Sequence, residues 1–129
     1  MSEIARALWE RAEEALAIAR MAVELGPNSS ASRSYYAAFQ ALSAYFALRG
    51  KTFTKHAQLR AAFHTDLVRP GVWPKSFAED FGRLWESRQT GDYGDIQKID
   101  SATALRAVDA ATRILDKVRA SHPDIFGDA

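Results

Sequence analysis

The 129-residue chain contains no cysteine, only four prolines and no long uncharged apolar run. The missing cysteines exclude disulfides, a thiol nucleophile and a thiolate metal site, and they are compatible with a reducing compartment. No segment reaches the roughly 20 apolar residues of a membrane-spanning helix, and residues 1–4 lack the basic-then-apolar order of a signal peptide. We therefore expect a soluble cytoplasmic protein without membrane contact.

Sequence patterns of several enzyme classes are also absent. The chain has no glycine-rich phosphate loop, no Gly-x-Ser-x-Gly nucleophile elbow and no HExxH metal motif. His56 and His64 would lie roughly 80° apart around a helix, and we interpret His64 and His122 as surface residues. These absences predict that the protein uses neither a metal ion nor another cofactor.

The net charge is only +1, but its distribution along the chain is uneven. Residues 31–75 hold seven basic side chains and one acidic side chain, a surplus of +6, whereas residues 1–30 and 76–129 are acidic. A basic middle section is typical of proteins that bind a phosphate-bearing partner. The alternative interpretation is an ordinary solvated surface that the acidic flanks balance once the chain folds.

Apolar residues recur at helical spacing, and no segment shows the alternation of a strand. The predicted helices cover residues 3–25, 30–49, 55–67, a run from 74 or 75 to about 88, and a run from 100 or 101 to about 122. They predict a single all-α domain, an up-and-down bundle of four main helices plus a shorter one. We expect its core within residues 3–120 and a frayed end at 124–129.

The apolar stripes also predict which residues face the core. Small alanines dominate the first helix, aromatic residues the second, and branched aliphatic residues the last. The predicted core positions of these three helices are Ile4, Leu8, Ala12, Ala15, Ala19, Ala22, Tyr35, Phe39, Leu42, Phe46, Leu105, Val108, Ala111, Leu115 and Val118.

The segment 86–94 places an arginine, an aspartate and a tyrosine at the end of the fourth predicted helix. If the helix continues, Arg88 and Asp92 lie one turn apart on the same side. We expect the two glycines of the segment, the first at Gly91, to bend the backbone so that Tyr93 turns back toward Arg88. The structural alternative is an i,i+4 ion pair that merely ends a helix.

Two stretches carry a resemblance to a known family. Ser32–Phe39, with its tandem tyrosines, resembles the second-helix signature of the HEPN domain. Lys55-His56 and then Arg88–Gly94 follow in the order and rough spacing of the small stand-alone prokaryotic branch. The resemblance covers about residues 5–120, and it implies a helical bundle that forms a homodimer, with two arginine motifs facing one cleft.

The resemblance implies one of two functions, of which the first is a toxin-like RNA endonuclease. Many HEPN proteins resemble metal-independent ribonucleases, whose motif is an arginine followed after four to six residues by a histidine. Carried over, that arginine is Arg88, and Tyr93 occupies the histidine position. Arg88 would stabilise the phosphorane, and Asp92 and Tyr93 would complete the catalytic set. A tyrosine with an ordinary pKa near 10 is, however, a poorer general base than a histidine.

The second implied function is a binding module. Other HEPN toxins pair with a small nucleotidyltransferase antitoxin of the type named MNT, and the tyrosine that matches Tyr93 is described there as a target of adenylylation. The chain would then bind a nucleotide or that partner without cleaving RNA. The tyrosine at position 93 favours this hypothesis, whereas Arg88 and its polar neighbours favour the first.

Further residues are predicted to surround these catalytic candidates. The residues proposed for binding, or for support of the catalytic set, are Arg33, Tyr35, Tyr36, His56 and Gln89. Buried phenols need hydrogen-bond partners, and His56 is either a structural histidine or a supporting acid. The chain has more large apolar side chains than one small core needs, among them Trp73, Phe77 and Trp85. This surplus favours a dimer.

Overall fold

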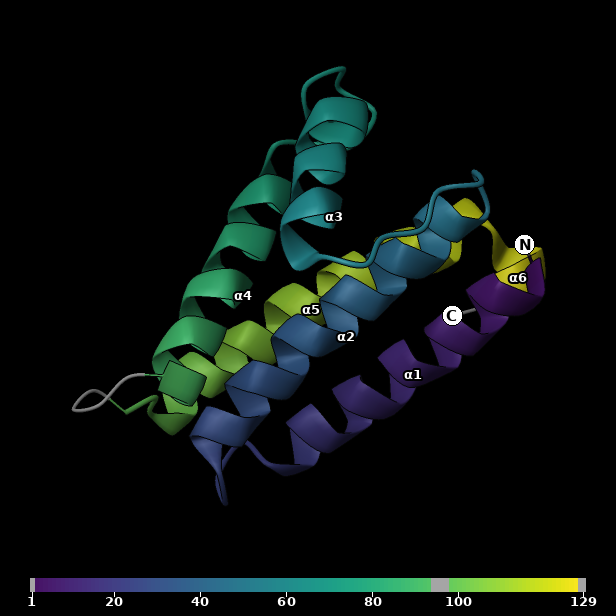
Figure 1. The fold of residues 1–129 in the computed structure, drawn as a ribbon. Helices are drawn as coiled ribbons and strands as arrows, with labels where there is room; N and C mark the ends of the chain where they lie inside the picture. Colours follow the sequence, from purple (N-terminus) through teal and green to yellow (C-terminus); the bar gives the residue numbers. More distant parts are fainter. Residues whose placement is uncertain (1, 94–97, 128–129) are drawn as a thin grey trace.

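The computed structural model describes residues 2–93 and 98–127, and of Tyr93 it describes the backbone only. Within these ranges the chain forms six α-helices and one π-helical segment, with no strand (Figure 1). In chain order they are α1 (Ser2–Met21), α2 (Pro27–Ala47), α3 (His56–Ala62), η1 (Phe63–Val68), α4 (Ser76–Tyr93), α5 (Ser101–Ser121) and α6 (Pro123–Phe126). The predicted all-α fold is confirmed.

Helix α2 is the centre of the bundle. α1 runs antiparallel along one side of it, α5 and α4 pack against other sides, and α3 lies beside α4 (Figure 1). α2 can occupy this position because most of its side chains are buried, and many of them are alanines that let neighbouring helices approach closely. α2 therefore contacts α1, α4 and α5 along its length, and it also contacts α3.

The chain reverses between α1 and α2, and α2 begins at Pro27 instead of the predicted residue 30. Proline is tolerated at the first helical position because its missing N–H would have no partner inside the helix. At the second residue of α2, Asn28 Oδ1 accepts a hydrogen bond of 2.8 Å from the backbone N–H of Ile99. This bond ties the start of α2 to the segment that precedes α5.

The third predicted helix consists of two elements, α3 and η1. In η1 the backbone N–H of Arg69 donates to His64 O, five residues earlier, at 2.8 Å. A π-helical turn contains one more residue than the α-helical period, which the spacing of an apolar stripe does not anticipate. The wider turn still directs Phe63 and Leu67 into the core.

Helix α4 continues through Gly91 to Tyr93, so the predicted bend at Gly91 is wrong. The glycine serves packing instead, because a Cβ atom at position 91 would lie 3.0 Å from the backbone oxygen of Asn28. A residue without a side chain lets the end of α4 approach the start of α2 this closely. Gly94, the second residue expected to bend the chain, lies outside the described residues.

α4 is also joined to α5 by an ion pair. Arg113 Nε and Nη2 donate to the two carboxylate oxygens of Asp80 at 2.9 and 2.8 Å. The Asp80 side chain is only 7% exposed, whereas the Arg113 side chain is 52% exposed. The contact therefore buries a carboxylate under an arginine that still reaches solvent.

Several predicted core positions require correction. Ile4 is 48% exposed and Leu105 is 51% exposed, because the buried stripes begin at their neighbours Ala5 and Ala104. Trp73 is 2% exposed, and Phe77 and Trp85 pack against the same core. The expected surplus of apolar groups is therefore wrong for Trp73, which the chain buries, whereas Phe77 and Trp85 are partly buried against the same core.

The segment expected to fray carries the short helix α6. Phe126 is 4% exposed, and its ring lies 5.0 Å from that of Trp9, between centroids. The prediction of a frayed end is therefore wrong for residues 124–127, while residues 128–129 lie outside the described part. Figure 1 shows α6 beside the N-terminal end of α1.

Candidate functional site

Arg88 lies in the last turns of α4, on the side that faces α2. Its Nε atom is 3.4 Å from Asp92 Oδ2, and the same carboxylate oxygen accepts a hydrogen bond of 3.0 Å from Ser32 Oγ of α2. Arg88 and Asp92 thus pair as their helical spacing predicts. The two side chains are 24% and 30% exposed, so the pair lies at the protein surface within reach of a ligand.

A shallow hollow of about 270 Å³ opens over this ion pair. Its walls come from α2 and α4, and the lining residues are Ser29, Ser32, Arg33, Tyr36, Arg88 and Asp92. We call this hollow the Arg88 pocket. Among the described residues, two guanidiniums and two serines line it against a single carboxylate, and this composition suits an anion with several oxygens.

The structure brings some of the predicted binding residues to the Arg88 pocket and leaves others out. Arg33 and Tyr36 line it, and Tyr36 is 37% exposed. Gln89 is exposed on α4 and is not among the described residues that line the pocket. The side chain of Tyr93 lies outside the described residues, and only its backbone, the last residue of α4, is placed.

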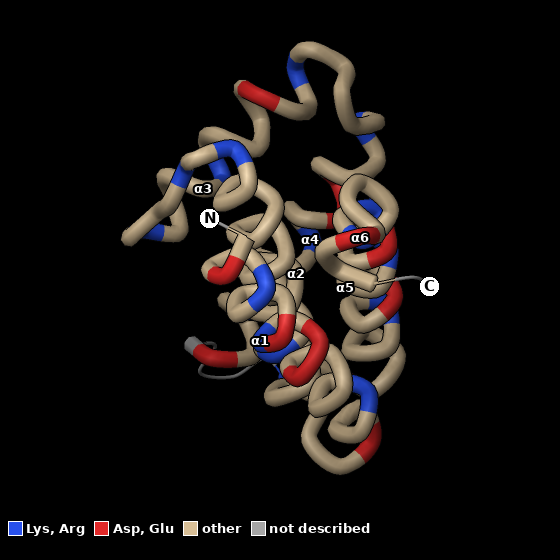
Figure 2. The backbone as a smooth tube through the Cα atoms, turned by 90° about the vertical axis from the view of Figure 1, so that its right-hand side faces the viewer, with Lys and Arg blue, Asp and Glu red and all other residues tan. Residues whose placement is uncertain are grey.

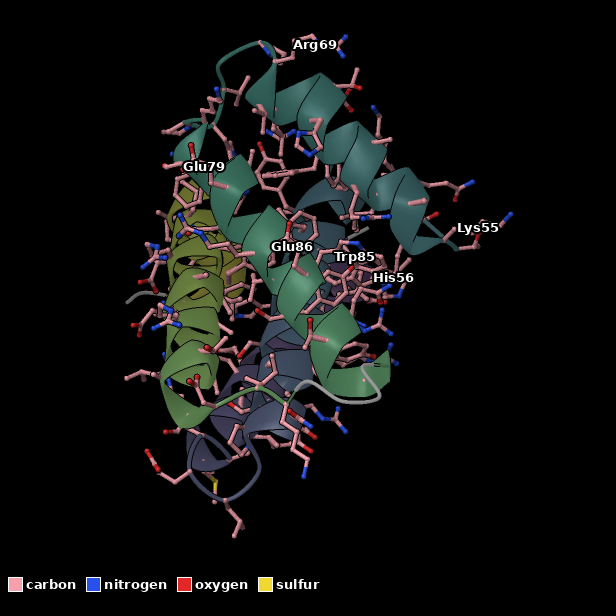
Figure 3. All side chains as sticks on the ribbon, turned by 90° about the vertical axis from the view of Figure 1, so that its left-hand side faces the viewer. Lys55, His56, Arg69, Glu79, Trp85 and Glu86 are labelled. Atoms are coloured by element: carbon pink, nitrogen blue, oxygen red, sulfur yellow. The ribbon has the colours of Figure 1, made fainter. Side chains whose placement is uncertain are left out.

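Tyr35 and His56 form a hydrogen-bonded pair near Arg88. The Tyr35 hydroxyl, on a fully buried side chain, lies 3.0 Å from His56 Nδ1 at the start of α3. The His56 ring is stacked on Phe39 with 4.0 Å between centroids. Figure 3 shows His56 next to Trp85, between α4 and the start of α3. The buried phenol therefore has the partner that its burial requires.

Two guanidiniums flank this pair. Arg88 Cζ lies 5.3 Å from the centroid of the Tyr35 ring, and Arg60 Cζ lies 3.9 Å from that of the Trp85 ring. Arg60 was not predicted as a site residue. The signal that could have identified it is its spacing of four residues from His56, which puts both on one face of α3. That signal is weak, because such spacings are common on any helix.

The surroundings of His56 lower its pKa from the ordinary 6.5, first through burial and then through the positive charges of Arg88 and Arg60. Burial raises the pKa of Tyr35, although the same two arginines act in the opposite direction. At pH 7 the pair is therefore a neutral imidazole beside a neutral phenol. A neutral imidazole accepts protons, so the interpretation of His56 as a supporting acid is not favoured.

Within residues 2–93 and 98–127, no direct ion pair joins the basic section 31–75 to the acidic flanks. Among the described residues, the single ion pair of this section joins Lys51 to Asp66 within the section itself, at 2.6 Å. Figure 2 shows basic segments around α3, whereas α1 and α5 carry acidic and basic residues side by side. The arginines near the Arg88 pocket thus belong to a surface with an excess of positive charge.

Two other features of the described residues bear on the earlier expectations. His64 is exposed, as predicted, whereas His122 is half-buried against the rings of Tyr45 and Phe126. In the described part of the chain, no three His, Asp or Glu side chains are grouped as metal ligands would be. No helix described there combines the length and apolar character needed to cross a bilayer.

Comparison with known proteins identifies relatives of this chain. The family described as the HEPN domain matches residues 5–121, from α1 to the end of α5. A UPF0332 protein of Thermotoga maritima is 32% identical over 91 residues, which cover 70% of this chain and 69% of that protein. The family match spans Tyr35, His56 and Arg88. The chain therefore belongs to the HEPN domain family.

Proposed function

We propose that this protein is a toxin-type RNA endonuclease that needs no metal ion and acts as a dimer. The observation that carries the proposal is the construction of the Arg88 pocket, in which Asp92 orients Arg88 and Ser32 holds Asp92. A guanidinium oriented in this way presents its N–H groups in a defined direction. Paired N–H groups of this kind suit the oxygens of a phosphodiester.

The other walls of the pocket suit a nucleotide. Arg33 adds a second guanidinium, and the exposed ring of Tyr36 offers a face on which a base can stack. The adjoining hollow of about 200 Å³ is lined in part by Arg11 and continues the pocket toward α1. The Arg88 pocket itself therefore offers an RNA strand two cations and one aromatic ring.

The chemistry of RNA cleavage places its main demand on charge stabilisation. The nucleophile is the 2′-hydroxyl of the substrate itself, so the protein needs no nucleophilic side chain. Attack on the adjacent phosphorus produces a phosphorane with additional negative charge, and Arg88 is positioned at the surface to neutralise it. One well-placed cation of this kind contributes about 3 kcal/mol to the stability of the transition state.

The dimer is supported by apolar groups beside the pocket. Ile18 of α1 is 40% exposed, and together with Tyr36 it lines the hollow that adjoins the Arg88 pocket. Ile4, further along α1, is 48% exposed. A second copy that covers this surface brings its own Arg88 pocket close to the first, which increases the positive charge around the RNA.

Light scattering at micromolar concentration tests the dimer. We expect the mass of two chains for the wild type and of one chain for Ile18→Glu, because a carboxylate cannot be buried without a partner. The monomeric variant should also lose most cleavage. A monomeric wild type that cleaves RNA would remove the dimer from the proposal.

Arg88→Ala tests the ribonuclease function directly. We expect RNA cleavage to fall about 100-fold, which corresponds to about 3 kcal/mol, while the melting temperature stays nearly unchanged, because a surface ion pair contributes little stability. The matched control is Arg83→Ala, since Arg83 belongs to the same helix, is 68% exposed and does not line the Arg88 pocket. Growth inhibition in cells should follow the same order, and a chelator should not reduce cleavage. Wild-type cleavage by Arg88→Ala would show that the site lies elsewhere.

A binding role without cleavage is the second candidate, and the residue at motif position 93 favours it. Tyr93 is the last residue of α4. If the protein is the partner of an MNT-type nucleotidyltransferase, incubation with that enzyme and ATP should add one adenylyl group, located on Tyr93 by mass spectrometry. Tyr93→Phe should prevent the addition while the fold stays intact. Modification of a wild-type protein that never cleaves RNA would favour this role over the ribonuclease.

A further inference from the structure

We propose that His56 and Arg60 of α3 complete the active site, His56 as the catalytic base and Arg60 as a second cation that binds the phosphate. This inference rests on the proposed ribonuclease function. The family's ribonuclease motif has a histidine where this chain has Tyr93, and His56 would provide the missing imidazole from a different helix.

The bundle brings three helices together at this point. Arg88 of α4 lies 5.3 Å from the Tyr35 ring of α2, and the Tyr35 and His56 rings are stacked with 5.7 Å between centroids. Arg88 and Arg60 lie 5.8 and 3.9 Å from the centroid of one common ring, Trp85. The imidazole and the two guanidiniums therefore lie around the same pair of aromatic rings, Tyr35 and Trp85.

His56 is held in a single orientation. Phe39 stacks on one face of its ring, and the Tyr35 hydroxyl engages Nδ1 at 3.0 Å. When Nδ1 carries the proton and donates it to the Tyr35 oxygen, the lone pair of Nε2 is available to a substrate. Tyr35 is thus a positioning residue, and its own raised pKa keeps it protonated at neutral pH.

Arg60 has an unused hydrogen-bonding atom. Its Nε is buried, and no acceptor among the described residues reaches it. The guanidinium stacks on Trp85, which fixes its plane without neutralising its charge. A buried N–H without a partner is unfavourable, and a phosphate oxygen between Arg60 and Arg88 would satisfy it.

The charged groups that face His56 explain why it takes up a proton more easily once a substrate is bound. Arg60 of α3 and Arg88 of α4 face it, and from α2 the only facing titratable group is the neutral Tyr35. The two arginines disfavour imidazolium in the free protein. A bound phosphodiester brings a negative charge between them, so protonation of His56 becomes easier in the complex than in the free protein.

The reaction is a transesterification without a cofactor. His56 Nε2 accepts the proton of the 2′-hydroxyl, the 2′ oxygen forms a bond to phosphorus, and the bond from phosphorus to O5′ breaks. The departing O5′ takes a proton from a water molecule, and the imidazolium returns its proton to the hydroxide that remains. The products are a 2′,3′-cyclic phosphate and a 5′-hydroxyl end, and no oxidant or reductant is consumed.

Cleavage by histidine variants tests the base. We expect His56→Gln to lose at least about 100-fold in single-turnover cleavage, and the matched control His64→Gln, an exposed histidine of η1, to cleave like wild type. His56→Asn is the second variant, because its amide can keep the hydrogen bond to Tyr35 but cannot accept a proton. For wild type, log kcat/KM should fall on the acidic side with a midpoint below 6.5, and neither His56 variant should show this midpoint.

RNA binding tests Arg60 and shows whether His56 meets the ligand. Arg60→Ala should weaken binding of RNA and reduce the salt dependence by about one phosphate contact, whereas Arg69→Ala, at the exposed end of η1, should do neither. A 2′-O-methyl RNA hexamer, which cannot be cleaved, should raise the pKa of His56 in an NMR titration and leave that of His64 unchanged.

The outcomes separate this inference from the proposed function. If Arg88→Ala abolishes cleavage while both His56 variants and Arg60→Ala cleave and bind like wild type, the ribonuclease stands and the inference is wrong. If wild type binds the hexamer but cleaves no RNA, the proposed function fails and the catalytic role of His56 fails with it. Loss of cleavage in both His56 variants with unchanged melting temperature, together with unchanged His64→Gln, supports the inference.

Discussion

Helix α4 carries two arginine–aspartate pairs that are built in opposite ways. Asp80 binds Arg113 of α5 through two contacts of 2.9 and 2.8 Å, with the carboxylate 7% exposed. Asp92 binds Arg88 of the same helix through one longer contact of 3.4 Å, and both side chains are partly exposed. The first pair joins two helices, whereas the second stays within one turn.

The difference shows how the same two residue types serve two purposes. Arg113 donates two N–H groups to the carboxylate of Asp80, and these hydrogen bonds raise the pKa of Arg113. A guanidinium that is paired in this way stabilises the contact between the two helices. Arg88 Nε lies 3.4 Å from its aspartate, and the side chain lines an open pocket with Arg33 and Tyr36. A phosphate can therefore approach Arg88 from this pocket.

Removal of the arginine from each pair should produce the clearest contrast. Arg113→Ala leaves a nearly buried carboxylate, with only the exposed Arg83 at 4.0 Å to replace the lost partner. We expect the free energy of unfolding to fall by about 2 kcal/mol, below the usual loss for a fully buried pair because Arg113 is itself half exposed. Arg88→Ala should lower it by less than about 1 kcal/mol.

Urea denaturation measures both effects, and RNA cleavage per folded molecule is the second readout. Arg113→Ala should cleave like wild type and Arg88→Ala should not. Asp80→Asn, which keeps an oxygen that accepts hydrogen bonds, should lose less stability than Arg113→Ala. Equal losses of stability in the two arginine variants would contradict the assignment of separate roles.

The two glycines of α4 provide a second test of the comparison. Gly82, near the Asp80 pair, has open space where a Cβ would lie, whereas the same atom at Gly91, near the Arg88 pair, would lie 3.0 Å from Asn28 O. Gly82→Ala should stabilise the protein by up to about 1 kcal/mol, because alanine is the better helix former. Gly91→Ala should show no such gain, since the end of α4 must move away from α2. A gain of the same size in both variants would show that the contact at position 91 is unimportant.

The pH dependence of stability should give the smallest effect. The pKa of His56 is lowered in the folded protein, so the unfolded chain binds more protons between that lowered value and the ordinary 6.5. Stability should therefore be fully present above about pH 6.5 and should decline as the pH falls through this window. His56→Gln should remove this part of the slope, whereas His64→Gln should leave it. An unchanged slope in His56→Gln would show that the neutral imidazole contributes nothing to the fold.

Local patterns in the sequence were sufficient for most of the helices. The last helix illustrates this, because its start was predicted at residue 100 or 101, and the side chain of Asp100 caps it by accepting a hydrogen bond from Thr103 N at 2.8 Å. The i,i+4 pairing of Arg88 with Asp92 was predictable for the same reason. Both depend on residues within one helical turn, and the period of the helix determines such distances wherever the helix packs.

Only the tertiary structure decided which distant residues meet. Arg60 and His56 join Arg88 through the packing of α3 beside α4, and no pattern in the sequence gives that distance. Phe126 packs on Trp9 from the opposite end of the chain, which turned an expected frayed end into a helix. At Gly91 the close contact with Asn28, and not the tendency of glycine to bend the backbone, determined the local structure. In each case the free energy comes from surfaces that only the folded bundle brings together, whereas the sequence alone determines the helices and the faces they can bury.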